Sequence, residues 1–260
     1  MIFGAHADLA TAIADTQAIG GTICQVFLGD PQSWKGPTAD TAALRTAAEA
    51  AGIGIYVHAP YLINVATTNN RVRIPSRQLL GKTLKAAAEV GALGVIAHGG
   101  HVLADDDPEA GFANWRKCVD QLDIAVPLLI ENTAGGANAM ARHLERITRL
   151  WAAVSESPNA GQIGWCLDTC HAHAAGLDLR TLVADITAIT GRIDLVHLND
   201  SRDAFGSGAD RHANLGQGNC DPAGLAAVAT QANAPVILET PGGVAEHRSD
   251  LEWLLRTDFI

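Results

Sequence analysis

The chain has 260 residues, of which 48% are hydrophobic and 18% charged, a composition that excludes a disordered protein and suits a globular one with a sizeable core. The formal net charge of −10 argues against broad electrostatic attraction to nucleic acid, and no segment reaches the ~20 apolar residues of a membrane helix. The amino terminus lacks the basic and apolar regions of a signal peptide, and the five cysteines form no CxxC pair. We therefore expect a cytoplasmic protein without a membrane segment, a disulfide framework or a thiolate zinc knuckle.

Short apolar runs alternate along the chain with longer Ala- and Leu-rich stretches of helical period, which is the pattern of repeated βα units. In chain order, the predicted strands are Ile2–Ala5, Thr22–Leu28, Ile53–Val57, Gly94–Ala97, Leu128–Ile130, Ile163–Leu167, Leu195–Leu198 and Val236–Leu238. The predicted helices between them are Leu9–Ile19, Thr41–Ala51, Arg77–Val90, Pro108–Leu122, Ala139–Val154, Leu179–Thr190, Pro222–Gln231 and Glu246–Leu255.

Eight βα units in about 250 residues predict an α/β fold, a (β/α)₈ TIM barrel, and no Pro/Ser-rich linker or charge block interrupts them. We expect a single domain over residues 1–260. The alternative architecture is an open doubly wound sheet, which usually carries a Gly-rich phosphate loop after its first strand, where this chain reads GAHADL. No P-loop, HExxH helix or GxSxG elbow is present, so the common NTPase, zincin and serine-hydrolase classes are disfavoured.

Metal-ligand residue types recur at the ends of six predicted strands: His58, His98, Glu131, Asp168, His197 and Glu239. In a parallel barrel these positions converge on one face, so ligands that are far apart in the sequence can share metal ions. Zinc accepts imidazole and carboxylate ligands, and a hydrolytic site keeps one position for water or substrate. The pattern therefore predicts a multinuclear metal hydrolase.

The candidate ligands divide into sets. His58, His98 and Glu131 supply a first metal, and Glu131 can bridge to a second set made of Asp168, His197 and Glu239. A third set lies in the loops and consists of His171, Asp210 and His212. In an extended D-x-H segment both side chains point to the same face, so Asp210 and His212 can bind one ion.

The strings PYLINVATTN, HGGH, ENTAGG, CLDTCHAHAAG, HLNDSRDAFGSGADRHANLGQG and LETP, in this order, resemble the endonuclease IV family of abasic-site endonucleases along essentially the whole chain. The resemblance implies a (β/α)₈ barrel with three Zn²⁺ per chain, with Mn²⁺ or another divalent ion as an alternative at one site. It implies that His58, His98 and Glu131 hold the first zinc, that Glu131, Asp168, His197 and Glu239 hold the second, and that His171, Asp210 and His212 hold the third.

The resemblance also implies the reaction. In base excision repair the enzyme hydrolyses the phosphodiester 5′ to an abasic site and leaves a 3′-hydroxyl and a 5′-deoxyribose phosphate, with Glu131 and Glu239 as the catalytic carboxylates. The expected partner is double-stranded DNA containing abasic sites, and the expected state is a cytoplasmic, nucleoid-associated monomer. Three zinc ions would change the formal charge from −10 to −4, with the added charge inside the site.

The chain departs from the family pattern outside the ligands. The fourth-strand motif reads HGGH where many members have Pro after the His, and in the loop FLGDPQSWKG only Lys35 is positively charged. In this family that loop contacts DNA, so the departure bears on the details of DNA contact more than on the chemistry. The expected DNA-binding residues are Trp34, Lys35, Tyr61, Asn64, Arg202 and Arg211.

Two alternative functions remain at this point. A sugar isomerase or epimerase on the same barrel would need one metal, held by Glu131, Asp168, His197 and Glu239, and would leave the third set unexplained. A catalytically silent DNA-binding or scaffold protein would not need the complete ligand set. Among the neighbouring residues, His6, His101 and His173 are expected to hydrogen-bond ligands rather than bind metal, Asn132, Asn199 and Asp200 to orient ligands or close loops, and Cys166 and Cys170 to take no thiolate role.

Overall fold

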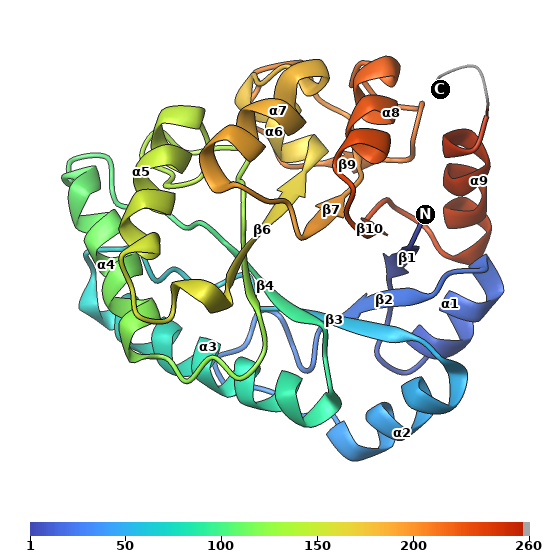
Figure 1. Ribbon diagram of the computed structural model, residues 1–260, viewed down its shortest axis with the longest axis horizontal. Helices are drawn as coiled ribbons and strands as arrows, with labels where there is room; N and C mark the ends of the chain where they lie inside the picture. Colours follow the sequence, from blue (N-terminus) through green and yellow to red (C-terminus); the bar gives the residue numbers. More distant parts are fainter. Residues whose placement is uncertain (257–260) are drawn as a thin grey trace.

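The computed structural model describes residues 1–256 and contains a closed barrel of eight parallel strands (Figure 1). Around the barrel the strands follow the order β1-β10-β7-β6-β5-β4-β3-β2. Their bounds are β1 Phe3–His6, β2 Ile23–Val26, β3 Gly54–His58, β4 Gly94–His98, β5 Leu128–Glu131, β6 Ile163–Asp168, β7 Leu195–His197 and β10 Val236–Leu238. The predicted (β/α)₈ barrel is thereby confirmed.

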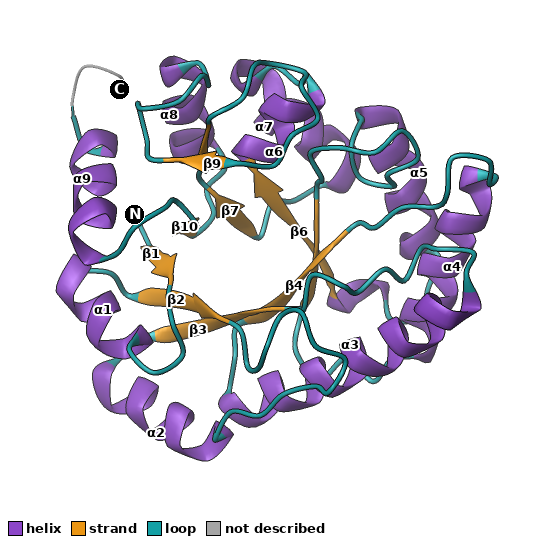
Figure 2. Ribbon diagram, turned by 180° about the vertical axis from the view of Figure 1, so that it is seen from behind, coloured by secondary structure: helices purple, strands orange, loops and turns teal. Residues whose placement is uncertain are grey.

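Helices lie outside the ring of strands (Figure 2). They are α1 Ala12–Ile19, α2 Thr41–Ala51, α3 Asn70–Val90, α4 Pro108–Gln121, α5 Leu144–Ser155, α6 Thr169–Ala175, α7 Leu179–Thr190, α8 Pro222–Gln231 and α9 Val244–Leu254, with a short 3₁₀ helix, η1, at Ala160–Gln162. Within residues 1–256, none of these helices combines the length and the hydropathy needed to cross a membrane.

The barrel interior explains why the strand ends carry the chemistry. One buried cluster takes a single residue from each of seven strands: Ile23, Tyr56, Ile96, Leu129, Cys166, Leu195 and Ile237. Because side chains alternate between the two faces of a strand, the residue two positions further along points inward again. Those next positions are Gln25, His58, His98, Glu131, Asp168, His197 and Glu239. The apolar cluster thus forms the layer of the barrel interior directly below the polar residues.

Four predicted helices begin at other residues: α1 begins at Ala12 rather than Leu9, α9 begins at Val244 rather than Glu246, and two others differ by five residues or more. Helix α3 begins at Asn70 rather than at Arg77, because the Asn69 side chain caps it by accepting a hydrogen bond from Arg71 N at 3.0 Å, and Pro75 is accommodated inside the helix. Helix α5 begins at Leu144 rather than at Ala139. The segment before it is not helical because its backbone pairs with neighbouring loops; for example, Met140 N donates to Gly100 O at 2.9 Å.

Three elements near the carboxyl ends of the strands were not predicted from the sequence. Helix α6 follows β6 directly, and β8 (Asp200–Ser201) pairs with β9 (His212–Ala213) in a small antiparallel sheet. Each is too short to produce a clear periodic signal in the sequence. They matter because α6 carries His171 and β9 begins with His212, so they place two candidate ligands above the barrel.

We predict that Gly4→Ala destabilises the barrel, because a Cβ at this position of β1 would lie 1.6 Å from the backbone carbonyl oxygen of Ile23 on β2. The clash is with backbone, so we expect the free energy of unfolding in urea to fall by at least about 3 kcal/mol. Gly161→Ala is the matched control, since its Cβ would meet nothing within 4 Å, and it should change stability by less than about 1 kcal/mol. Equal stability of the two variants would contradict the close approach of β1 and β2.

Candidate metal centre

The polar layer at the carboxyl end of the barrel takes one side chain from every strand. In chain order these residues are His6, Gln25, His58, His98, Glu131, Asp168, His197 and Glu239, the last of which directly follows β10. Six of them are the strand-end ligands that the sequence analysis singled out. Gln25 was missed. The sequence offered a clue to it, since Gln25 is the one polar residue in the apolar run ICQVF of a predicted buried strand.

Glu131 lies at the middle of this layer and is fully buried. Its Oε2 atom is 3.3 Å from Nε2 of His58 and 3.3 Å from Nε2 of His98. Its Oε1 atom is 3.0 Å from Nδ1 of His197, and that nitrogen is also 3.3 Å from Oε2 of Glu239. One carboxylate therefore touches both of the strand-borne ligand sets, as a bridging ligand would.

The third candidate set, His171, Asp210 and His212, also lies at the carboxyl end of the barrel, next to the strand-end residues. Asp168 caps α6 by accepting a hydrogen bond from His171 N at 2.6 Å, which turns the His171 side chain toward the barrel mouth. The Asp210 carboxylate lies between two imidazoles: Oδ2 is 3.1 Å from Nε2 of His171, and Oδ1 is 3.1 Å from Nε2 of His212. His212 Nε2 is also 3.9 Å from Oδ2 of Asp168, so the third set adjoins the second.

Hydrogen bonds to backbone carbonyls select the ring nitrogen that three of the histidines present to the centre. Nδ1 of His58 lies 2.7 Å from Ala59 O, Nδ1 of His171 lies 2.9 Å from Asn132 O, and Nδ1 of His212 lies 3.1 Å from Glu239 O. A carbonyl only accepts, so each Nδ1 carries a proton, and Nε2 is the nitrogen that can bind a cation, whether a proton or a metal ion. The Nε2 atoms lie 3.1–3.3 Å from carboxylate oxygens of Glu131 and Asp210.

Asparagine side chains hold the carboxylate ligands in place. Asn132 donates from Nδ2 to Asp168 O at 2.8 Å and accepts from Asp168 N at 2.7 Å. Asn199 donates to Oδ2 of Asp168 at 2.6 Å and accepts from Glu239 N at 2.8 Å. Both asparagines thus orient ligands. The histidines His6, His101 and His173 bond Gln25, Asn64 and the carbonyl of Asp203 instead, so none of them bonds a candidate ligand directly.

The electrostatics of the centre favour positive charge. Burial alone would raise the pKa of the Glu131 carboxyl, but His197, His98 and His171 hold that pKa well below its usual range. Burial lowers the pKa of an imidazole, yet the pKa of His171 is raised well above its ordinary value, most strongly by Asp168. The same holds for the pKa of His197, which Cys166 and Glu239 raise. The carboxylates therefore stabilise cations here, whether protons or metal ions.

The residues fit zinc on two observations. A tetrahedral zinc ion with bonds of ~2.0–2.1 Å separates its ligand atoms by about 3.3–3.4 Å, and the candidate ligand pairs around Glu131 and Asp210 lie 3.0–3.3 Å apart. In addition, Nε2 of His212 is buried and makes no hydrogen bond, although Asp210 Oδ1 is 3.1 Å away. A cation between the two atoms would satisfy both.

Two cysteines, Cys166 and Cys170, lie beside the candidate ligands. Cys166 is close enough to Glu131 and His197 to share an ion with them, and Cys170 is similarly close to Asp210 and His212. Burial raises the pKa of each thiol to about 12, so both sulfurs are protonated near neutral pH unless a metal ion displaces the proton. The imidazole and carboxylate atoms are the better-placed ligands.

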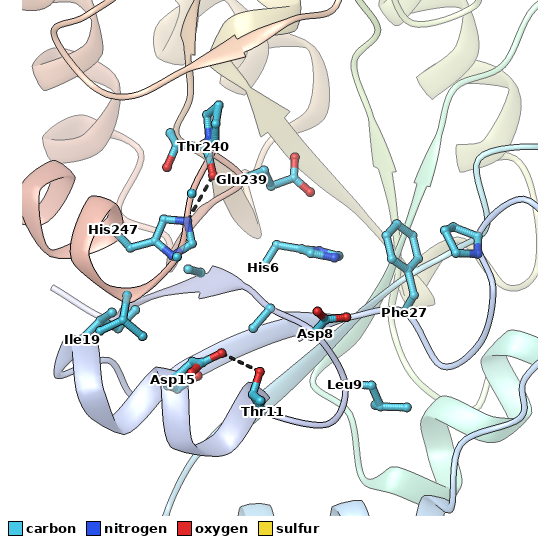
Figure 3. A pocket seen from close by; sticks show the side chains of 18 of the residues that line it. His6, Asp8, Leu9, Thr11, Asp15, Ile19, Phe27, Glu239, Thr240 and His247 are labelled. Carbon is cyan, nitrogen blue, oxygen red and sulfur yellow. Dashed lines mark hydrogen bonds between the residues drawn. The ribbon is translucent and has the colours of Figure 1, made fainter.

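Among the cavities that touch candidate ligands, two share Tyr61, His212 and Glu239 in their linings. The smaller, of about 210 Å³, is lined by His58, Tyr61, His98, His171, Asp210, His212 and Glu239. The larger, of about 860 Å³, extends from Glu239 and His212 past the ends of β1 and β10 to α1 and α9. Figure 3 shows the His6 ring on its wall, between Glu239 and Phe27. A bulky polar substrate therefore has room beside the candidate ligands.

The aromatic residues expected to bind DNA lie at the surface. Trp34 is 44% exposed in the loop after β2, and Tyr61 is 54% exposed in the loop after β3. The Tyr61 ring packs edge-on against Phe27, 5.0 Å away between centroids, and lies 5.5 Å from the His58 ring. Phe205, in the loop between β8 and β9, is 60% exposed and was not singled out in the sequence.

The polar residues expected to bind DNA differ in their exposure and in whether their side chains already have a partner within the protein. Asn64 is buried, and its amide bonds the loop after β4: Nδ2 donates to His101 O at 2.9 Å, while Oδ1 accepts from His101 N at 3.2 Å. Arg211 is exposed but forms a two-pronged ion pair with Asp203. Lys35 and Arg202 are exposed. Asn64 thus joins two loops, whereas the exposed cations can reach a ligand.

Comparisons with known proteins show which proteins the chain resembles in sequence and in fold. A family model described as a xylose isomerase-like TIM barrel matches residues 13–257. The chain is 55% identical over 242 residues to "Probable endonuclease 4" of Mycobacterium ulcerans, a match that covers 92% of this chain and 93% of that protein. The crystal structure of endonuclease IV from Thermus thermophilus matches with a TM-score of 0.81 at 30% identity, covering 98% of this chain and 99% of that one. A D-tagatose 3-epimerase-like protein matches with a TM-score of 0.78 at 18% identity, which is a likeness of fold alone.

We predict that Asp200→Asn loosens the loop that carries Asp210 and His212. The buried Asp200 carboxylate accepts four backbone hydrogen bonds, two per oxygen, from Ser201, Gly216, Gly218 and Cys220 at 2.7–3.0 Å. An amide at this position would point a donor at two of these donors. Because a hydrogen bond to a charged group contributes roughly 1.5–3 kcal/mol, we expect two of the four amides to exchange with solvent at least about tenfold faster.

Amide exchange measured by NMR checks this expectation, with Leu129 and Ile130 on β5 as internal references that should not change. Asp178→Asn is the matched control, because asparagine can replace aspartate as the cap of α7. Unchanged exchange at all four amides in the Asp200 variant would show that the carboxylate does not hold the loop.

Proposed function

Because the chain belongs to the endonuclease IV family of xylose isomerase-like TIM barrels and is a nuclease enzyme, we propose that it hydrolyses DNA 5′ to abasic sites. The products are a 3′-hydroxyl and a 5′-deoxyribose phosphate, as in base excision repair. The observation that carries the proposal is the convergence of nine imidazoles and carboxylates at one barrel mouth. A sugar isomerase that uses one metal would leave five of these residues without a role: His58, His98, His171, Asp210 and His212.

We propose three zinc sites. The first is formed by His58, His98 and Glu131, and the second by Glu131, Asp168, His197 and Glu239, sets whose ligand atoms lie within 4.8 Å of one another. The third is formed by His171, Asp210 and His212. When bound, zinc polarises the phosphoryl oxygens, offsets the charge of the developing alkoxide and lowers the pKa of water from 15.7 to about 7.

The two glutamates have different roles in this proposal. Glu131 has no exposed surface, so it joins the two strand-borne sets and holds their spacing without reaching the substrate. The Glu239 side chain is 14% exposed and lines both cavities. Its carboxylate can therefore face the attacking water and accept its proton, provided that the scissile phosphate lies over the smaller cavity.

Selectivity for abasic DNA follows from the cost of turning a nucleotide out of the duplex. A nucleotide without a base has lost its stacking and pairing energy, so it can be extruded more cheaply than an intact one. The larger cavity lies beside Glu239 and can receive the extruded sugar. The exposed rings of Trp34 and Tyr61 belong to the loops that follow β2 and β3, at the carboxyl end of the barrel, and are suited to stack against the remaining bases.

The central experiment presents the purified protein with duplex DNA that contains one abasic site and with an intact duplex. We expect three zinc ions per chain by elemental analysis, incision only on the 5′ side of the abasic site, and at least a roughly 100-fold loss of rate on chelation that added zinc reverses. Asp210→Ala should lower both the zinc content and the rate, while Asp123→Ala, exposed at the opposite end of the barrel, should alter neither. One metal ion per chain, turnover of a ketose and no incision would support the isomerase instead.

We further propose that Trp34, Lys35, Tyr61, Arg202 and Arg211 contact the DNA and that Asn64 holds the loop that presents Tyr61. Removing a phosphate contact lowers the dependence of log K on log salt by about one. We expect this change for Lys35→Ala and for Arg202→Ala in binding measured at several salt concentrations. Arg211→Ala should change the slope less, because Asp203 already balances its charge.

Lys117→Ala is the control for these measurements, since Lys117 is exposed on α4, outside the barrel. An unchanged slope for both Lys35→Ala and Arg202→Ala would remove these residues from the DNA contact surface. That result would not bear on the proposed hydrolysis at the metal centre.

A further inference from the structure

Gln25 occupies the one position in the polar layer whose side chain cannot ionise. It is fully buried on β2, at the carboxyl end of the barrel. Its amide meets three groups from three other strands. Oε1 lies 2.8 Å from Nε2 of His197, and Nε2 lies 2.5 Å from Oε1 of Glu239 and 3.0 Å from Nδ1 of His6.

Only one arrangement of protons satisfies all three contacts. The Glu239 carboxylate is an acceptor, so the NH₂ group of Gln25 must face it and the carbonyl oxygen must face His197. That oxygen also only accepts, and therefore Nε2 of His197 carries the proton. The second hydrogen of the NH₂ group then goes to Nδ1 of His6, which acts as an acceptor.

This arrangement leaves Nδ1 of His197 as the ring nitrogen that can bind a cation, whether a proton or a metal ion. Nδ1 is the nitrogen that lies 3.0 Å from Glu131 and 3.3 Å from Glu239, where the second zinc is proposed. His58, His171 and His212 present Nε2 because backbone carbonyls take the proton of Nδ1. His197 presents the opposite nitrogen, and a side chain rather than the backbone selects it.

We infer that Gln25 is a positioning residue, which selects the metal-binding ring nitrogen of His197 and orients the Glu239 carboxylate. The inference rests on the proposed zinc centre, because it assigns Gln25 to the second of its sites. Partners that orient metal ligands in this way typically contribute about 10–100-fold to metal affinity. Gln25 acts on two ligands at once and also ties His6 to them.

The test compares zinc-loaded wild-type protein with Gln25→Met and Gln25→Glu. Methionine has a similar shape and removes all three hydrogen bonds, so we expect one of the zinc ions to be lost at a free zinc concentration about 10–100-fold higher than in the wild type. Zinc content after equilibration with a chelator measures this. Val26→Ala, a buried residue on the same strand that faces the helices, is the control for loss of packing and should keep all its zinc.

Nitrogen-15 NMR of labelled histidines supplies a readout that a purely structural role would not move. The wild type should show a slowly exchanging proton on Nε2 of His197. Gln25→Met should lose that signal, and Gln25→Glu, which still accepts at this position, should keep it. The assignment of His197 comes from a His197→Asn sample.

The outcomes separate the inference from the proposed function. If the wild type holds no zinc and does not incise abasic DNA, the proposed function fails. If the wild type holds its zinc and Gln25→Met matches it in both zinc affinity and the Nε2 proton signal, the role of Gln25 fails alone. Loss of the signal in Gln25→Glu as well as in Gln25→Met would also contradict it, since glutamate retains the acceptor.

Discussion

The structure depends on how the buried charge of Glu131 is compensated. A carboxylate without exposed surface is costly unless ionised and polar partners surround it. Here the partners are imidazoles brought by β3, β4, β7 and α6, with ring nitrogens 3.0–3.3 Å from the carboxylate oxygens. These elements come from separate parts of the chain, so the charge can be compensated only when the barrel is closed. The same arrangement of carboxylates favours positive charge at the centre.

Inward-facing side chains recur at every second residue of a strand, so the candidate ligands and the core residues below them occupy successive inward positions of the same strands. Apolar side chains fill the lower inward position of seven strands, and polar side chains fill the next one. On β1 the lower position is Gly4, whose lack of a side chain allows a close approach to β2. A change in strand register would move both layers together, so core packing and ligand geometry are set by one constraint. This is why the strand-borne ligands could be identified as a group.

The loop-borne ligands are positioned differently. Asp210 and His212 are held by the pairing of β8 with β9 and by the four backbone hydrogen bonds to Asp200. His171 depends on the Asp168 cap of α6, so one residue serves as both candidate ligand and helix cap. The part of the centre most exposed to substrate thus rests on a small number of hydrogen bonds. The acidic net charge does not conflict with a DNA substrate, because attraction would come from the cations in the centre and from a few rim residues.

The sequence by itself determined the barrel, its eight strands and the six strand-end candidate ligands, because apolar runs and strand-end positions are local features of the chain. The three loop-borne candidates, His171, Asp210 and His212, were named from the D-x-H spacing and from the family resemblance. The sequence could not determine which ring nitrogen each histidine presents, because the deciding partners are Ala59 O, Asn132 O, Glu239 O and Gln25, most of them far away in the chain. Only the tertiary structure revealed that Gln25 belongs to the polar layer at the barrel mouth and bonds Glu239. It also revealed that the Asn64 side chain is hydrogen-bonded to His101 and that Arg211 forms an ion pair with Asp203. Hydrogen bonds depend on distances and angles between residues that only the closed barrel brings together.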